Sequence, residues 1–132
     1  MPRLTLSSLV LSLGLAFLPA NSASAQTFEE AAQAYQAGDY TTALAGLREI
    51  ALGGNADAQL LLGTMLFNGE GVEADYVEGL RWFKSAADAG NPAAAFALAS
   101  AYRTGAGTAR NDAEARRYFE RASSGGLVSA KF

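Results

Sequence analysis

Three carboxylates, Glu70, Glu73 and Asp75, cluster in and directly after a glycine-containing turn, and they are the side chains best placed for acid–base chemistry. Paired carboxylates act as general acid and base when their environments push their pKa values apart. The chain has no His and no Cys, which removes Ser-His and Cys-His nucleophiles and the commonest transition-metal ligands. A solvated, helix-capping turn also accounts for the three carboxylates. The sequence therefore predicts no enzyme, no cofactor and no metal site.

The same turn contains Gly69 and Gly71, a spacing that also occurs in phosphate-binding loops. No strand pattern precedes the pair, and neither the GxGxxG nor the GK[ST] context is present. Paired glycines equally suit a turn whose backbone must visit positive φ. We therefore predict a structural turn.

The elements around this turn occur twice in the chain. Residues 55–90 and 91–126, each 36 residues long, can be laid on each other without a gap. The matched pairs are Ala58 with Ala94, Leu62 with Leu98, Gly69 with Gly105, Gly71 with Gly107, Glu78 with Glu114, Phe83 with Phe119, Ala86 with Ala122 and Gly90 with Gly126. Such a period is typical of a solenoid, in which no unit buries its apolar face alone and each stacks on its neighbours.

Each repeat has the pattern of a helix pair. Apolar side chains recur at steps of three and four from about residue 56 to 67, which predicts the first helix of the first repeat. Asn55 and Asn91 are suitable N-caps for the two first helices. Asp75-x-x-Glu78 and Asn111-x-x-Glu114 have the pattern of capping boxes that open the second helices.

These units predict an all-α fold, a short α-solenoid of stacked antiparallel helix pairs. A shortened pair over residues 26–54 begins the array, and residues 127–132 are expected to start a further helix. Gly63 is expected to permit close helix approach at some expense in helix propensity. Trp82 and Tyr118, at equivalent positions, are expected to be wedged between stacked helices.

Residues 1–25 have the pattern of a cleavable signal peptide, with Arg3, an apolar run from Leu4 to Leu18 and the small-residue site Ala23-Ser24-Ala25. The alternative is a membrane anchor, but an interrupted run of 15 residues is short for a hydrocarbon core that needs about 20. We therefore predict cleavage before Gln26, a periplasmic or secreted location, and no stable membrane insertion afterwards.

Charge argues against polyanionic partners. Loss of Arg3 with the leader leaves nine Lys and Arg against 13 Asp and Glu, a formal net charge of −4. Such a balance disfavours nucleic acid and anionic membranes as the main partner. Basic residues gather in the second repeat, where Arg117 and Arg121 are expected to complement the dipole of their own helix.

The repeated motifs resemble the Sel1-like repeat, a relative of the tetratricopeptide repeat. The resemblance is carried by Ala58-x-x-x-Leu62-Gly63, Gly69-x-Gly71-Val72-x-x-x-Tyr76 and Trp82-Phe83-x-x-Ala86-Ala87-x-x-Gly90, with a weaker second copy. Residues 34–44 resemble the tetratricopeptide-like unit that often leads such arrays in secreted bacterial proteins.

This resemblance implies a scaffold, adaptor or regulator of other proteins without activity of its own. Exported bacterial members of the family are associated with envelope signalling and with the control of cell-wall enzymes. The expected partner is therefore another envelope or periplasmic protein, and no small-molecule ligand is expected.

The first helices of stacked pairs line a concave side, so their residues away from the packing stripe are expected to bind the partner. By spacing, this concave row consists of Leu60, Thr64, Phe67, Phe96, Ser100 and Arg103. Its apolar and Arg side chains are typical interface anchors, although packing against a neighbouring helix is an equally good explanation for some of them. Direct binding of cell-wall glycan or peptide is the alternative function.

Overall fold

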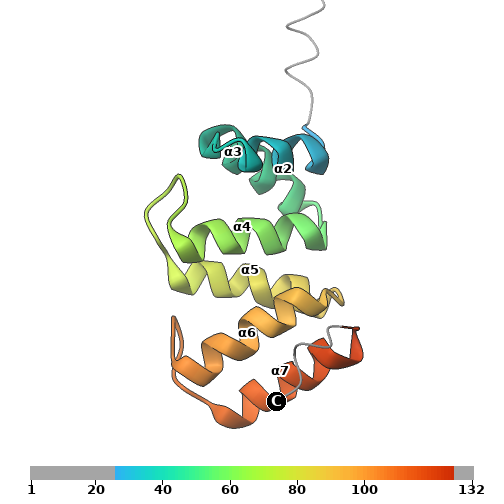
Figure 1. The fold of residues 1–132 in the computed structure, drawn as a ribbon, viewed down its shortest axis with the longest axis vertical. Helices are drawn as coiled ribbons and strands as arrows, with labels where there is room; N and C mark the ends of the chain where they lie inside the picture. Colours follow the sequence, from blue (N-terminus) through green and yellow to red (C-terminus); the bar gives the residue numbers. More distant parts are fainter. Residues whose placement is uncertain (1–25, 127–132) are drawn as a thin grey trace, which may run out of the picture.

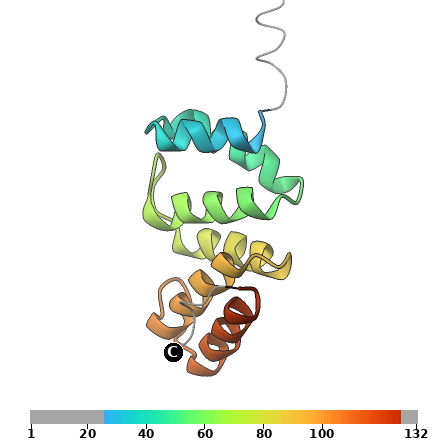
Figure 2. The same cartoon turned by 45° about the vertical axis from the view of Figure 1, so that its right-hand side comes forward.

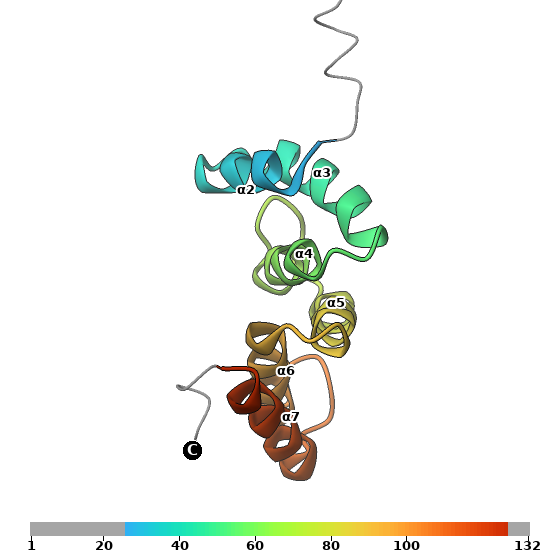
Figure 3. The same cartoon turned by 90° about the vertical axis from the view of Figure 1, so that its right-hand side faces the viewer.

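The computed structural model describes residues 26–126, which form six helices. The helices are α2 (Phe28–Gln36), α3 (Tyr40–Leu52), α4 (Ala56–Asn68), α5 (Tyr76–Asp88), α6 (Pro92–Thr104) and α7 (Asp112–Ser124). Consecutive helices form pairs that follow one another along the long axis (Figure 1), with α2 and α3 at one end and α6 and α7 at the other. The turned views in Figures 2 and 3 show the same order. The predicted all-α solenoid is confirmed, whereas the predicted leader and the helix start at 127–132 lie outside the described residues.

Side-chain caps begin all six helices. The N-cap side chains accept hydrogen bonds from the backbone N–H three residues on, and they are Thr27, Asp39, Asn55, Asp75, Asn91 and Asn111. In the described chain, the reciprocal half of a capping box is present at Thr27, whose backbone N–H donates to Glu30 at 2.9 Å. The capping boxes predicted at Asp75 and Asn111 are therefore only half formed. Glu78 lies 3.7 Å from Arg48, and Glu114 lies 2.6 Å from Arg117.

The turns within the two repeats have the same hydrogen bonds. The backbone N–H of Asp75 donates to the Leu66 carbonyl at 2.8 Å, and that of Asn111 donates to the Tyr102 carbonyl, also at 2.8 Å. These four residues are two pairs separated by 36 positions. The sequence repeat is therefore also a repeat of backbone geometry.

Helix α4 belongs to two cores at once. One face carries Ala58, Leu62, Met65 and Leu66 into an N-terminal core shared with α2 and α3. Other residues of α4 pack against a C-terminal core built from α5, α6 and α7. Each helix pair thus covers the apolar face that its neighbour cannot bury alone.

Close approach between α4 and α5 depends on glycine. A Cβ atom on Gly63 would lie 2.9 Å from the Phe83 ring and 3.0 Å from the Gly79 carbonyl oxygen, closer than the packing allows. The predicted role of Gly63 is confirmed. The equivalent positions of the second repeat are Ala99 and Ala115.

The wedge predicted for Trp82 and Tyr118 is also observed. Trp82 is half-buried against the N-terminal core, although it lies on α5. Tyr118 is buried, and its ring stacks on Tyr102 with centroids 5.9 Å apart and an interplanar angle of 9°. Both aromatic side chains therefore contribute to packing between helices.

Arg121 connects the two repeats through contacts that the sequence did not predict. Arg121 donates from Nη2 to the Ala87 carbonyl oxygen at 2.7 Å, and its Nη1 lies 3.6 Å from Asp88 Oδ1. The guanidinium therefore complements the C-terminal end of α5, not only that of its own helix α7.

Candidate functional site

The six residues of the concave row differ in exposure. Arg103 is exposed, whereas the other five are half-buried. Leu60, Phe67 and Phe96 pack against the C-terminal core. For these three residues, the alternative of packing against neighbouring helices therefore holds, whereas their role in partner binding stays a prediction.

Aromatic contacts account for much of this packing. The Phe67 ring lies 4.7 Å from that of Tyr76 and 5.8 Å from that of Phe83, between centroids. The Phe96 ring meets Phe119 edge-on at 5.4 Å. Such pairs stabilise a fold by about 0.5–1.5 kcal/mol beyond the area that they bury. Truncating Phe67 or Phe96 will consequently affect folding as well as any binding.

The structure brings Phe67 and Ser100 together across the boundary between the repeats. Both line a surface hollow of about 280 Å³, and the other lining residues are Phe83, Ala97, Ala101, Thr104 and Ala106. Thr64 lies one turn before Phe67 on α4, and its hydroxyl donates to the Leu60 carbonyl oxygen at 2.9 Å. We call the hollow lined by Phe67 and Ser100 the inter-repeat hollow.

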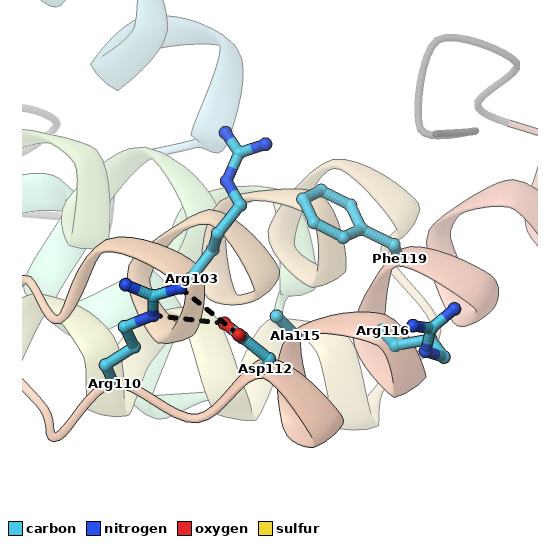
Figure 4. Close-up of a pocket in the computed structure, with 6 residues that line it drawn as sticks. All are labelled: Arg103, Arg110, Asp112, Ala115, Arg116 and Phe119. Carbon is cyan, nitrogen blue, oxygen red and sulfur yellow. Dashed lines mark hydrogen bonds and ion pairs between the residues drawn. The ribbon is translucent and has the colours of Figure 1, made fainter.

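A second hollow, also of about 280 Å³, lies at the last helix pair (Figure 4). It is lined by Arg103, Arg110, Asp112, Ala115, Arg116 and Phe119, and we call it the terminal hollow. The Arg103 guanidinium carbon lies 5.6 Å from the centre of the Phe119 ring, a cation–π arrangement. Of these six residues, sequence reasoning had singled out only Arg103 for binding.

Electrostatics in the terminal hollow are dominated by arginine. Arg110 donates to Asp112 through Nε and Nη2, with both distances 3.2 Å. Hydrogen bonding and the nearby positive charge of Arg110 lower the pKa of Asp112 below its usual value. The Asp112 carboxylate is therefore ionised at neutral pH and holds Arg110 at the edge of the hollow.

Two of the three carboxylates in and after the first glycine turn take part in structural hydrogen bonds. Glu70 accepts hydrogen bonds from the Tyr35 hydroxyl, at 3.1 Å to each oxygen, and Asp75 caps α5. Burial, together with the hydrogen bond and charge of Glu70, raises the pKa of Tyr35. Glu73 is exposed. Over residues 26–126, no group of three His, Cys, Asp or Glu side chains is arranged to hold a metal ion.

Comparison with known proteins identifies the repeat. The Sel1 repeat model matches residues 56–91 and 92–127, more than half of the chain. The chain belongs to the Sel1 repeat family. No curated protein matches it significantly. None of the helices in residues 26–126 has the length and apolar character needed to cross a membrane.

Solved structures support the Sel1 repeat assignment. A Sel1 repeat protein from Oxalobacter formigenes is 28% identical with a TM-score of 0.76, and the match covers 79% of this chain and 43% of that protein. The protective antigen c5321 of uropathogenic Escherichia coli is 33% identical with a TM-score of 0.67, and the match covers 69% and 20%. Cysteine-rich protein B of Helicobacter pylori shares the fold at 20% identity, with a TM-score of 0.66 and 68% coverage of both chains. This chain thus spans less than half the length of the first two.

Proposed function

We propose that this chain is a non-catalytic protein-interaction scaffold of the bacterial cell envelope that binds its partner through the concave row. Sel1 repeat proteins are generally protein-interaction scaffolds. The signal-peptide pattern of residues 1–25 supports export to the periplasm or beyond. The absence of His and Cys from the sequence supports a role without catalysis.

The observation that carries the proposal is the inter-repeat hollow. Its lining is almost entirely apolar, and it lies where α6 meets the α4–α5 pair. Phe67 and Ala97 contribute to it from different repeats, so a partner seated there contacts both units. Interface anchors bind in such well-packed depressions, and aromatic side chains are common among them.

A steric test separates binding from folding better than truncation does. Ser100→Arg places a long side chain in the inter-repeat hollow from a half-buried helical position, without removing a core side chain. Ser85→Arg is the matched control, because Ser85 is exposed on α5 and lies outside this hollow. We expect Ser100→Arg to weaken partner binding at least about tenfold, while both variants melt close to the parent protein.

The partner is to be captured from an envelope extract with the parent protein and identified by mass spectrometry. Binding of the purified partner is then measured for the parent protein and for both variants. Equal affinity of Ser100→Arg and Ser85→Arg would show that the contact surface lies elsewhere. Retention on insoluble peptidoglycan from which proteins have been removed would instead support direct binding of cell-wall glycan or peptide.

A further inference from the structure

The terminal hollow is the second-repeat counterpart of a surface that α6 partly covers in the first repeat. There, Phe67 and Phe83 face residues of α6 in the inter-repeat hollow. The turn after α6 rests on the beginning of α5, since a Cβ atom on Gly107 would lie 2.8 Å from Tyr76 Cβ and 3.0 Å from Leu80 Cδ1. Phe67, Leu80 and Phe83, with Cβ and the backbone of Tyr76, thus form the surface on which the next unit packs, while the Tyr76 side chain stays half exposed.

In the second repeat, 36 positions further along the chain, the equivalent residues are Arg103, Asp112, Arg116 and Phe119. All four line the terminal hollow, together with Arg110 and Ala115. Within residues 26–126, α7 is the last helix, and Phe119 is nevertheless 6% exposed, close to the 4% of Phe83. Phe119 therefore keeps the ring of Phe83. Phe67, Tyr76 and Leu80 are replaced by Arg103, Asp112 and Arg116.

Charge indicates what kind of segment fits this surface. Residues 91–126 carry five Arg against three acidic side chains, whereas residues 26–90 carry three basic against ten acidic ones. The terminal hollow holds three of those five arginines and a single carboxylate. A segment that occupies it therefore gains from carboxylates that face these arginines.

We propose that the terminal hollow is a second interaction surface, which binds an acidic helical segment of a partner protein in the place where a further repeat would stack. This surface is distinct from the inter-repeat hollow, although Arg103 also belongs to the concave row. Ser100 does not line the terminal hollow, so Ser100→Arg leaves the terminal hollow intact. A test of the terminal hollow is therefore independent of the proposed function above.

The probe is a synthetic peptide with the sequence of residues 91–107, because α6 packs on the equivalent surface of the first repeat. The acidic form carries Ser100→Glu and Thr104→Glu, and the basic form carries Lys at both positions. These two α6 residues line the inter-repeat hollow with Phe67, so their replacements are expected to face Arg103 in the terminal hollow. We expect the acidic peptide to bind the purified protein at least about tenfold more tightly than the basic one.

Charge reversal in the protein supplies the matched control. Arg116→Glu changes the terminal hollow, whereas Arg81→Glu makes the same charge change at an exposed position of α5. We expect Arg116→Glu alone to weaken the acidic peptide about tenfold or more and to strengthen the basic one. Binding of the acidic peptide should also weaken as NaCl rises from about 50 to about 500 mM. Thermal melts establish that each variant is folded.

Several results would overturn the proposal. Equal binding of the two peptides, or no binding of either, removes the charge argument. A similar loss with Arg81→Glu means that the effect is not local to the terminal hollow. Tighter peptide binding after deletion of residues 127–132 assigns the hollow to the chain's own end. Self-association that Arg116→Glu abolishes assigns it to a second copy.

Discussion

Replacement of Gly107 by Ala tests whether stacking of one repeat on the next stabilises the domain. Gly107 has φ +77° and lies in the turn between α6 and α7, which rests on the beginning of α5. Gly105 has φ +83° in the same turn, but a Cβ atom there would meet its nearest neighbours at 3.6–3.7 Å, an ordinary contact. The two positions therefore share the backbone strain and differ in the contact between repeats.

The expected losses in the free energy of unfolding follow from the backbone strain and from the contact between repeats. An L residue in the left-handed region costs about 1–2 kcal/mol, which is the whole expected loss for Gly105→Ala. At Gly107 the new methyl group would lie 2.8 Å from Tyr76 Cβ and 3.0 Å from the Tyr76 carbonyl oxygen. Overpacking against such atoms adds about 1–3 kcal/mol. We therefore expect Gly107→Ala to lower the free energy of unfolding by at least about 1 kcal/mol more than Gly105→Ala.

The assay is urea unfolding followed by far-UV circular dichroism, with both variants and the parent protein measured together. In a thermal melt, the same difference of about 1 kcal/mol corresponds to a shift of about 4–8 °C in melting temperature for a domain of this size. Gly71→Ala is an internal replicate, because a Cβ atom on Gly71 would meet Tyr40 in the same way. Equal losses at Gly105 and Gly107 would refute the reasoning, since the contact between repeats would then contribute nothing.

Three further predictions concern the core, a tyrosine and the leader. Phe67→Ala should lower the free energy of unfolding by about 2 kcal/mol in urea unfolding, because Phe67 is half-buried against two aromatic rings, whereas Lys84→Ala at an exposed position should change it by less than about 0.5 kcal/mol. Glu70→Gln should bring the raised pKa of Tyr35 closer to its ordinary value in an NMR titration. Because that pKa is raised in the fold, the associated stability is present below the ordinary tyrosine pKa and is lost as pH rises through the folded value. Protein purified from the producing cell should have the mass expected for cleavage after Ala25, and an uncleaved cytoplasmic product would contradict export.

The sequence by itself determined the local elements. Helix α4 begins and ends within a residue of its predicted bounds, because N-cap side chains and apolar steps of three and four act over a few neighbouring residues. Gly69 and Gly71 have φ +73° and +76°, as the paired-glycine turn predicted. The 36-residue period was sufficient for the solenoid, since each unit exposes an apolar face that only a neighbour can cover.

Tertiary structure alone decided which side chains meet across the repeats. For Phe67 and Phe96 the sequence leaves open a partner-facing surface or packing on a neighbouring helix, and the structure packs them against rings that follow them by 16 and 23 positions in the chain. Glu78 completes no capping box and lies near Arg48 of the preceding unit. Arg116 joins Arg103 in the terminal hollow. These contacts depend on the angle and distance at which helix pairs stack, and that geometry is set by packing among residues distant in sequence.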